Sequence, residues 1–168
     1  IQDTTLCRRA MKRLAVDVKV GPSPAWLVEK LVALGQRSIN NVVDIANYVM
    51  LDTGQPVHTF DFDKLTGEKK TIAIKRATDS EQITTLDGAT YTLDSNMLVI
   101  HDGHVSLDIA GIKGGKESGI DENTTRVLLS VCNFDPVSVR KTSRKLKLTT
   151  DASVRFQNNP SPELTTIA

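Results

Sequence analysis

The sequence contains little of what marks several classes of protein. Its 168 residues include two cysteines and three histidines, and only 4% are aromatic. Cys7 and Cys132 stand far apart with no CxxC spacing, which argues against a disulfide scaffold and against a zinc knuckle. No apolar run reaches the length of a membrane span and no signal peptide is visible, so a cytoplasmic location is expected.

The chain also lacks a strong charge of either sign. Its formal net charge is +1, so any electropositive partner site has to come from local clustering. The proportions of hydrophobic and charged residues, 39% and 24%, are those of a globular protein. There is no initiator Met, and the final PSPELTTIA begins like a helix, with Ser161 as cap and Pro162 as first residue. We therefore expect residues 1–168 to be one domain excised from a longer multidomain chain.

The first third of the chain is predicted to hold one strand and two helices. Residues 13–20 alternate apolar and polar side chains, as a half-buried strand does. Ser23 is placed as the N-cap of a helix that Gly35 ends. A second helix is expected over about 41–51, with Gly54 ending it.

From Thr71 onward the pattern changes to short strands. Six apolar stretches are separated by polar links or turns, and Asp87-Gly88 and Asp102-Gly103 are strong hairpin signals. Asp135-Pro136 then starts a third helix, PVSVRKTSRKLKL. Helices near both ends with strands between them predict an α+β fold rather than a doubly wound sheet.

The segment LDTGQPVHTFDFDKL raises the question of whether His58 is a functional group or a histidine at the end of a loop. With Asp61 and Asp63 it suggests a metal site, but no second His/Cys pair stands at ligand spacing, and we expect no metal. His101 and His104 flank a predicted turn, where exposed polar residues are normal.

The segment AGIKGGKESG holds four glycines after a predicted strand. It lacks the GxxxxGK[ST] order of a phosphate-binding loop and the helix that follows one. Two interpretations stay open. The glycines allow another backbone or a ligand to approach closely, or they form a tight loop with several positive-φ residues.

The third predicted helix is strongly basic, because Arg140, Lys141, Arg144 and Lys145 lie within six residues. Such a run is usually a solvated face. Contact with the phosphates of a nucleic acid is the alternative, since it needs only clustered positive charge.

Several long segments resemble one family. RSINNVVDIANYVMLDTGQPVHTFDFDKL, TLDGATYTLDSNMLVI, AGIKGGKESGI and FDPVSVRKTSRKLKLTTDASVRF are similar, in this order, to the editing domain of the beta subunit of bacterial phenylalanyl-tRNA synthetase. The match is colinear from about Cys7 to Phe156. The resemblance implies an α+β fold with layered mixed β-sheets and helices packed on one side.

The resemblance also implies a task. The parent synthetase attaches phenylalanine to its tRNA with ATP and Mg at sites in other domains, together with an alpha subunit in a heterotetramer. Because tyrosine differs from phenylalanine by one hydroxyl, an apolar pocket rejects it only weakly. The editing domain then accepts tyrosine and hydrolyses the ester of Tyr-tRNA(Phe). No cofactor is implied within this domain.

The family's editing pocket can be carried over residue by residue. His58 and Asn47 match the positions that orient the hydrolytic water or the ester. The other matched positions, which contact the substrate, are Arg37, Pro56, Gly111, Gly114, Thr150 and Ala152. Whether His58 acts as a general base or only as a positioning group stays open at this point.

Two departures from the family pattern bear on activity. Ser130 in VLLSVCNF stands where the family usually carries a Glu that accepts the tyrosine hydroxyl, and FQNNPSPE replaces a segment close to FERGVDP. A serine hydroxyl makes a weaker and shorter-reaching hydrogen bond than a carboxylate. The alternative to an active editing hydrolase is therefore a non-catalytic module for tRNA contact or subunit architecture, or a diverged paralogue.

Overall fold

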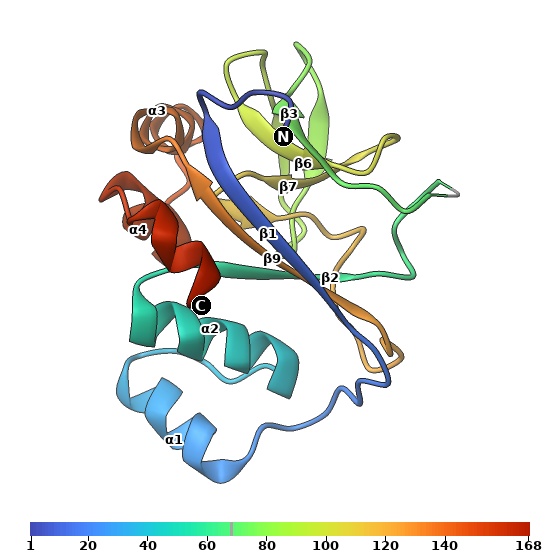
Figure 1. The fold of residues 1–168 in the computed structure, drawn as a ribbon, viewed down its shortest axis with the longest axis vertical. Helices are drawn as coiled ribbons and strands as arrows, with labels where there is room; N and C mark the ends of the chain where they lie inside the picture. Colours follow the sequence, from blue (N-terminus) through green and yellow to red (C-terminus); the bar gives the residue numbers. More distant parts are fainter. Residues whose placement is uncertain (68) are drawn as a thin grey trace.

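Strands from distant parts of the chain form the first sheet. A computed structural model describes residues 1–67 and 69–168, and in it β1 (Cys7–Ala15), β9 (Val127–Phe134) and β2 (Val57–Asp61) lie in the order β1-β9-β2. Both pairs are antiparallel. In Figure 1 the blue β1 and the orange β9 run side by side, with β2 beyond them.

The second sheet and a separate hairpin come from the middle of the chain. The sheet has the order β3-β6-β7-β8 and the hairpin pairs β4 with β5, again antiparallel. Gly88 and Gly103 have positive φ angles, +83° and +104°, which confirms the two predicted Asp-Gly turns. The strands are β3 (Ala73–Arg76), β4 (Gln82–Thr84), β5 (Thr90–Thr92), β6 (Leu98–His101), β7 (Ser106–Ile109) and β8 (Lys113–Gly114).

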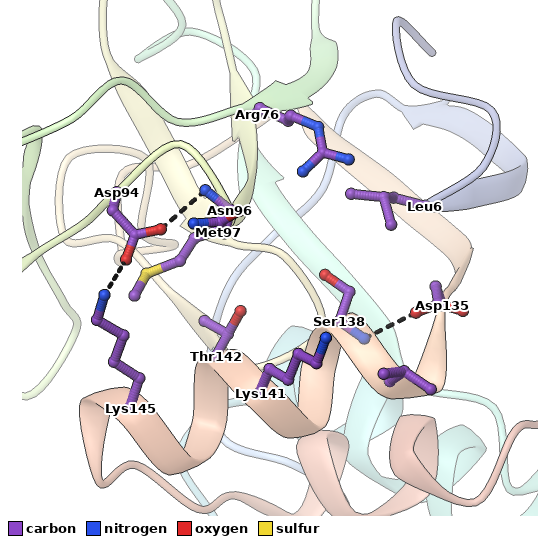
Figure 2. Close-up of a pocket in the computed structure, with 11 residues that line it drawn as sticks. Leu6, Arg76, Asp94, Asn96, Met97, Asp135, Ser138, Lys141, Thr142 and Lys145 are labelled. Carbon is purple, nitrogen blue, oxygen red and sulfur yellow. Dashed lines mark hydrogen bonds and ion pairs between the residues drawn. The ribbon is translucent and has the colours of Figure 1, made fainter.

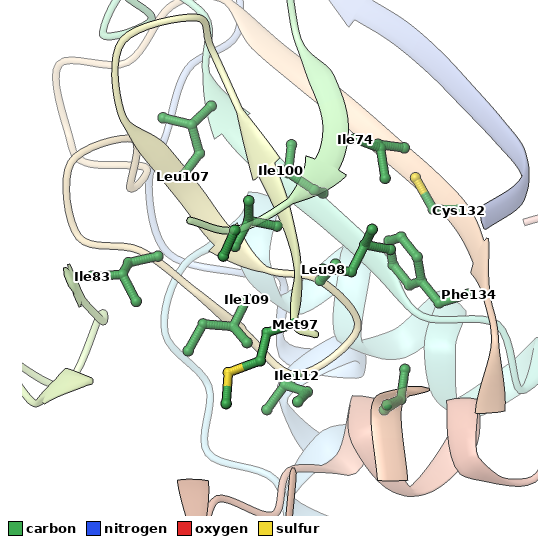
Figure 3. Packing of buried hydrophobic residues seen from close by; sticks show 14 of the residues in the cluster. Ile74, Ile83, Met97, Leu98, Ile100, Leu107, Ile109, Ile112, Cys132 and Phe134 are labelled. Atoms are coloured by element: carbon green, nitrogen blue, oxygen red, sulfur yellow. The ribbon is translucent and has the colours of Figure 1, made fainter. Parts of the chain in front are cut away.

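The hydrophobic core lies between the two sheets. Figure 3 shows Cys132 and Phe134 of β9 close to Ile74 and Ile100 of the second sheet. All four side chains are less than 5% exposed. Each burial of this kind stabilises the fold by roughly 1.5–3 kcal/mol for a large apolar side chain. The core therefore holds both sheets in fixed positions around any pocket between them.

The helices gather on one side of the sheets, to the left and below in Figure 1. This confirms the predicted α+β class and the single domain, although the strand pairs among the described residues are antiparallel rather than mixed. The helices are α1 (Ala25–Ala33), α2 (Asn41–Thr53), α3 (Pro136–Leu146), α4 (Asp151–Gln157) and the short 3-10 helix η1 (Pro162–Thr166).

Most of the predicted helix ends are confirmed. Gly54 has a φ of +78° and ends α2, and the Asp135 carboxylate accepts the Ser138 N–H at 2.7 Å at the start of α3. Ser23 does not cap α1. Its hydroxyl donates at 2.6 Å to the buried Asp44, which also accepts from Ser38 and so ties α1 to α2.

The prediction for residues 13–20 is wrong in its boundaries. The strand starts at Cys7 and ends at Ala15, because Asp17 has a φ of +56° and breaks the extended chain. The observed strand thus begins six residues before the alternating stretch. None of the described helices is both long and apolar enough to cross a bilayer.

Candidate active site

An inner pocket of about 70 Å³ lies between the two sheets. His58, Ser130 and Cys132 line it from the first sheet, together with Pro56 just before β2, and Ile100, Asp108 and Gly114 line it from the second. Gly111 and Ile112 follow β7, and Ala152 and Phe156 of α4 close it.

The inner pocket adjoins a larger outer cleft of about 710 Å³. Pro56, His58, Gly114 and Ala152 line both, so the two spaces share a wall. Arg37, Asn47 and Thr150 belong to the outer cleft alone, whereas Gly111 and Ser130 belong to the inner pocket alone. The fold thus brings together all nine residues that the sequence places in the catalytic and substrate-binding sets.

His58 lies on a strand and not in a loop. It is the second residue of β2, and its imidazole packs edge-on against Phe60 with 4.5 Å between ring centroids. Its side chain is 30% exposed, and 3.6 Å separate its Nε2 from Oδ2 of Asp108. Removal from water, together with the positive charge of Lys12, lowers the pKa of His58 to about 4. The imidazole is therefore neutral at pH 7.

Gly114 gives the imidazole of His58 its space. A Cβ on Gly114 would lie 2.5 Å from Cε1 and 3.0 Å from Nε2 of His58. Gly115 is similarly tight, because its Cβ would lie 2.7 Å from the carbonyl oxygen of Leu107. Of the four glycines in this segment only Gly111 has a positive φ, +74°. The close-approach interpretation of AGIKGGKESG is therefore correct, and the expectation of several positive-φ residues is wrong.

Ser130 stands in a row of polar side chains that crosses the first sheet. Its Cα is paired with those of Lys12 on β1 and His58 on β2. The Lys12 ammonium donates to the Ser130 hydroxyl and lies 3.8 Å from the sulfur of Cys132. The Cys7 thiol and the positive charge of Lys12 lower the pKa of the Cys132 thiol, whereas burial acts in the opposite direction.

Asp108 is a pocket residue that sequence reasoning missed. It alternates with apolar neighbours in VSLDIAGI, which indicates an exposed position on a half-buried strand. In the structure every residue of β7 is buried, and Asp108 lies close to the first sheet, with 3.6 Å between its Oδ2 and Nε2 of His58. Burial chiefly, and then Cys132, raise the pKa of Asp108 well above its usual range, while Lys12 acts in the opposite direction.

The start of α4 connects the outer cleft to the glycine segment. The Thr150 side chain accepts the Ser153 N–H at 3.1 Å as a helix cap and donates to the carbonyl oxygen of Ile112 at 2.7 Å. α4 was not predicted from the sequence. Its capping box, formed by Thr150 and Ser153, is the signal that marks it.

The acidic residues after His58 do not complete a metal site. Asp61 accepts a hydrogen bond from Thr124 at 2.7 Å, and Asp63 forms an ion pair with Arg126. Within residues 1–67 and 69–168, no group of three or more His, Cys, Asp or Glu side chains is arranged to hold a metal ion. His101 also departs from expectation. It lies at the buried end of β6 and accepts the Gly103 N–H, and it is not an exposed turn residue.

A separate groove of about 480 Å³ lies along α3 (Figure 2). Lys141 and Lys145 line it, and Arg140 and Arg144 do not. Lys145 pairs with Asp94 at 2.6 Å, and Arg76 at the groove pairs with Asp3 at 2.9 Å. The four basic residues of α3 are exposed, and the charge of Lys145 is already balanced by Asp94.

Comparison with known proteins decides the family. The B3/4 domain model matches residues 6–168, nearly the whole chain. The chain belongs to the B3/4 domain family. A curated relative, the phenylalanine–tRNA ligase beta subunit of Clostridium acetobutylicum, is 48% identical over 163 residues, which are 97% of this chain and 20% of that protein. The corresponding subunit of Geobacter sulfurreducens is 46% identical over 168 residues, 100% of this chain and 21% of that protein.

The resemblance to the bacterial beta subunit is thereby confirmed for this B3/4 domain. A solved structure with a similar fold is an N-terminal fragment of the phenylalanyl-tRNA synthetase beta subunit from Pyrococcus horikoshii. It has a TM-score of 0.56 and 14% identity, and the match covers 83% of this chain and 46% of that one. The B3/4 domain described here spans about a fifth of the length of the curated relatives that it matches.

Proposed function

We propose that this B3/4 domain hydrolyses the ester of tyrosine attached in error to tRNA(Phe). The observation that carries the proposal is the inner pocket that adjoins an outer cleft, with His58 on their shared wall. An aminoacyl ester has the matching shape: a side chain on one side of the ester bond and a nucleotide on the other. The amino-acid side chain would occupy the inner pocket and the terminal nucleotide the outer cleft.

The inner pocket is suited to an aromatic side chain with a polar end. Ile100, Ile112, Phe134 and Phe156 supply apolar surface, as ligand pockets commonly do. The polar side chains of Ser130 and Asp108 supply hydrogen-bonding groups. Tyrosine has both characters, whereas phenylalanine leaves the polar groups without a partner, which costs binding free energy.

His58 would orient water and would not be a strong base. With a pKa of about 4 its imidazole is neutral at pH 7 and accepts a proton only weakly. A neutral imidazole still accepts one hydrogen bond and donates another. In the hydrolysis the water oxygen bonds to the ester carbonyl carbon, the bond from that carbon to the ribose oxygen breaks, and the ribose oxygen takes the proton. Asn47 in the outer cleft would hold the ester side of the substrate.

The wider context follows from the similarity to phenylalanine–tRNA ligase beta subunits. The domain would act within a cytoplasmic synthetase that pairs this chain with an alpha subunit, binds tRNA(Phe) and charges it with phenylalanine. ATP and Mg would be used in other domains of that enzyme. The exposed basic residues of α3 would contact tRNA.

One observation favours a second candidate function. Ser130 in the inner pocket is a hydroxyl that already accepts from Lys12, so it is a weaker partner for a phenol than a carboxylate is. A domain that no longer edits would serve as a tRNA-contacting or architectural module, or as part of a diverged paralogue.

Deacylation separates the two candidates. The protein in its native length, assembled with its natural subunits, is incubated with Tyr-tRNA(Phe), and release of tyrosine is followed over time. Release above the uncatalysed rate, reduced by His58→Ala, is the expected result. Release equal to the uncatalysed rate would rule out editing and leave the non-catalytic module.

A further inference from the structure

We propose that Asp108 is the residue that selects a hydroxyl-bearing side chain in the inner pocket. This inference rests on the proposed function, because it names the group that reads the substrate at the same site. Neither the sequence pattern nor the family resemblance indicated Asp108.

Asp108 lines the inner pocket from the second sheet. It lies on β7, and its Cα is paired with that of Gly114 on β8, over which the His58 ring sits. It therefore faces the first sheet across the inner pocket, on the wall opposite Ser130. A ligand side chain that enters between the sheets meets Asp108 on one wall and Ser130 on the other.

Among the described residues, Asp108 lacks the partners that a buried carboxyl needs. Its side chain is only 6% exposed, and Oδ1 is buried with no hydrogen-bond partner among the described residues. Oδ2 is 3.6 Å from Nε2 of His58, longer than a hydrogen bond. Buried polar groups in proteins are nearly always paired, so an unpaired carboxyl in a pocket is best explained by a ligand that pairs with it.

Other buried aspartates in the chain show the contrast. Asp44 accepts from the hydroxyls of Ser23 and Ser38 and from the Ile39 N–H. Asp102 accepts from the N–H and the hydroxyl of Thr66. These carboxylates hold the fold together, and Asp108, which lines a pocket, has no comparable set of donors among the described residues.

The lining of the inner pocket limits the chemistry of a ligand that pairs with Asp108. The pocket around Asp108 is mainly apolar, with Ile100, Phe134 and Phe156 among its lining. A group that fills this space and supplies a hydroxyl is an aromatic side chain of the tyrosine class. Because burial raises its pKa, the carboxyl of Asp108 is held toward its neutral form, which accepts through its carbonyl oxygen and donates through its O–H. A phenol hydroxyl can pair with the carboxyl in either way, because it both donates and accepts a hydrogen bond.

The competing role for Asp108 is to orient His58. A positioning carboxyl would affect every ester alike, since His58 stands at the reacting end of the substrate. A selecting carboxyl would affect only the ester whose side chain carries a hydroxyl. Comparison of tyrosyl and phenylalanyl substrates therefore distinguishes the two roles.

The experiment uses the native-length protein with its natural subunits and compares deacylation of Tyr-tRNA(Phe) and Phe-tRNA(Phe). Asp108→Val removes both oxygens and suits a buried strand position. We expect the ratio of the two rates to fall about tenfold, as the loss of one hydrogen bond to a buried carboxyl would give. Ile100→Val, which removes one methylene from the same pocket, is the matched control and should change both rates by a similar factor.

A second set of measurements does not depend on hydrolysis. Tyrosyl and phenylalanyl amides of 3′-amino-3′-deoxyadenosine, which cannot be hydrolysed as esters, are titrated into the same proteins by calorimetry. The wild-type protein should bind the tyrosyl amide about tenfold more tightly, and Asp108→Val should lose that preference. If neither ester is hydrolysed while this preference is seen, the proposed function fails and the role of Asp108 stands.

Two results would overturn the inference. One is an unchanged ratio of the two rates in Asp108→Val, whether both rates fall equally or neither falls, and the other is a wild-type protein without preference for the tyrosyl amide. Thermal unfolding checks that each variant folds. If Asp108→Val does not fold, Asp108→Asn keeps the shape and replaces the acid O–H, and it should reduce the preference about threefold, roughly half a hydrogen bond's effect.

Discussion

His58 and Ser130 face each other across the β2–β9 ladder, and both line the inner pocket. Lys12 extends the row on β1, where it donates to the Ser130 hydroxyl. Side chains directly opposite in an antiparallel pair are about 5 Å apart at Cβ, so the three groups form a polar strip on the face turned toward the second sheet. Asp108 approaches the strip from that second sheet.

The low pKa of His58 predicts an unusual pH profile. A histidine of ordinary pKa acting as a base would lose its rate as pH falls through about 6.5. With a folded pKa of about 4, His58 is still neutral at pH 6.5. The part of the deacylation rate that depends on His58 should therefore fall only near pH 4. The measurement is the rate at saturating Tyr-tRNA(Phe) between pH 4 and 8, corrected for uncatalysed hydrolysis. An inflection near 6.5 that His58→Gln removes would contradict the prediction.

Asp108→Asn should stabilise the fold. A carboxyl whose folded pKa is raised contributes stability that is fully present below its unfolded pKa of about 3.8 and is lost as pH rises through the folded value. Its amide analogue does not titrate. The variant should therefore unfold at a higher temperature at pH 7, by about 1 kcal/mol of unfolding free energy, and the gain should shrink toward pH 4.

The matched control for that stability test is Asp61→Asn. Asp61 is also buried, but it accepts a hydrogen bond from Thr124. Its replacement should lower the unfolding temperature at pH 7, because it weakens a satisfied contact. If both variants shift the unfolding temperature in the same direction, the unpaired state of Asp108 is not the cause of the shift in Asp108→Asn.

Ser130→Glu should raise the rate on Tyr-tRNA(Phe). A carboxylate beside Lys12 would accept a phenol hydroxyl more strongly than a serine hydroxyl does, by about 1–2 kcal/mol or roughly fivefold to thirtyfold in rate. Ser130→Gln has a similar shape without the charge and should raise the rate less. Single-turnover deacylation is the measurement. An unchanged rate in Ser130→Glu, with the fold intact, would show that this position does not read the hydroxyl.

Gly114→Ala should reduce activity while it leaves most of the fold intact. The added Cβ would lie 2.5 Å from Cε1 of His58, so the imidazole has to move. Displacement of a positioned group by about 1 Å costs about 100-fold in rate. Gly21→Ala is the control, because its Cβ would meet no atom within 4 Å in the described part of the chain. Equal activities of the two variants would mean that the position of His58 is unimportant.

The basic face of α3 gives a prediction about salt. If Arg144 and Lys145 contact phosphates, their joint replacement by Ala should weaken tRNA binding and reduce the slope of log K against log salt by about two. Lys145 also pairs with Asp94, so the thermal unfolding of the double variant has to be measured together with its tRNA binding. Lys19→Ala serves as a control for charge alone. An unchanged slope would make α3 a solvated face.

Local signals predicted much of the secondary structure. Gly54 and Asp135 mark helix ends because a left-handed residue and a capping carboxylate act within one turn of chain. The Asp-Gly turns act over four residues and placed both hairpins. The strand at 13–20 was misplaced, since alternation alone does not show where the backbone leaves the sheet at Asp17.

The sequence by itself determined the α+β class, through its order of helices and strands, and the family, through long colinear motifs around His58 and Gly111. Tertiary structure alone decided which side chains share a pocket. His58, Ser130 and Asp108 are up to 72 residues apart in the sequence, and only the pairing of β2 with β9 and the packing of the two sheets bring them together. Burial and unmet hydrogen bonding depend on contacts between distant segments, which is why the sequence alone did not single out Asp108.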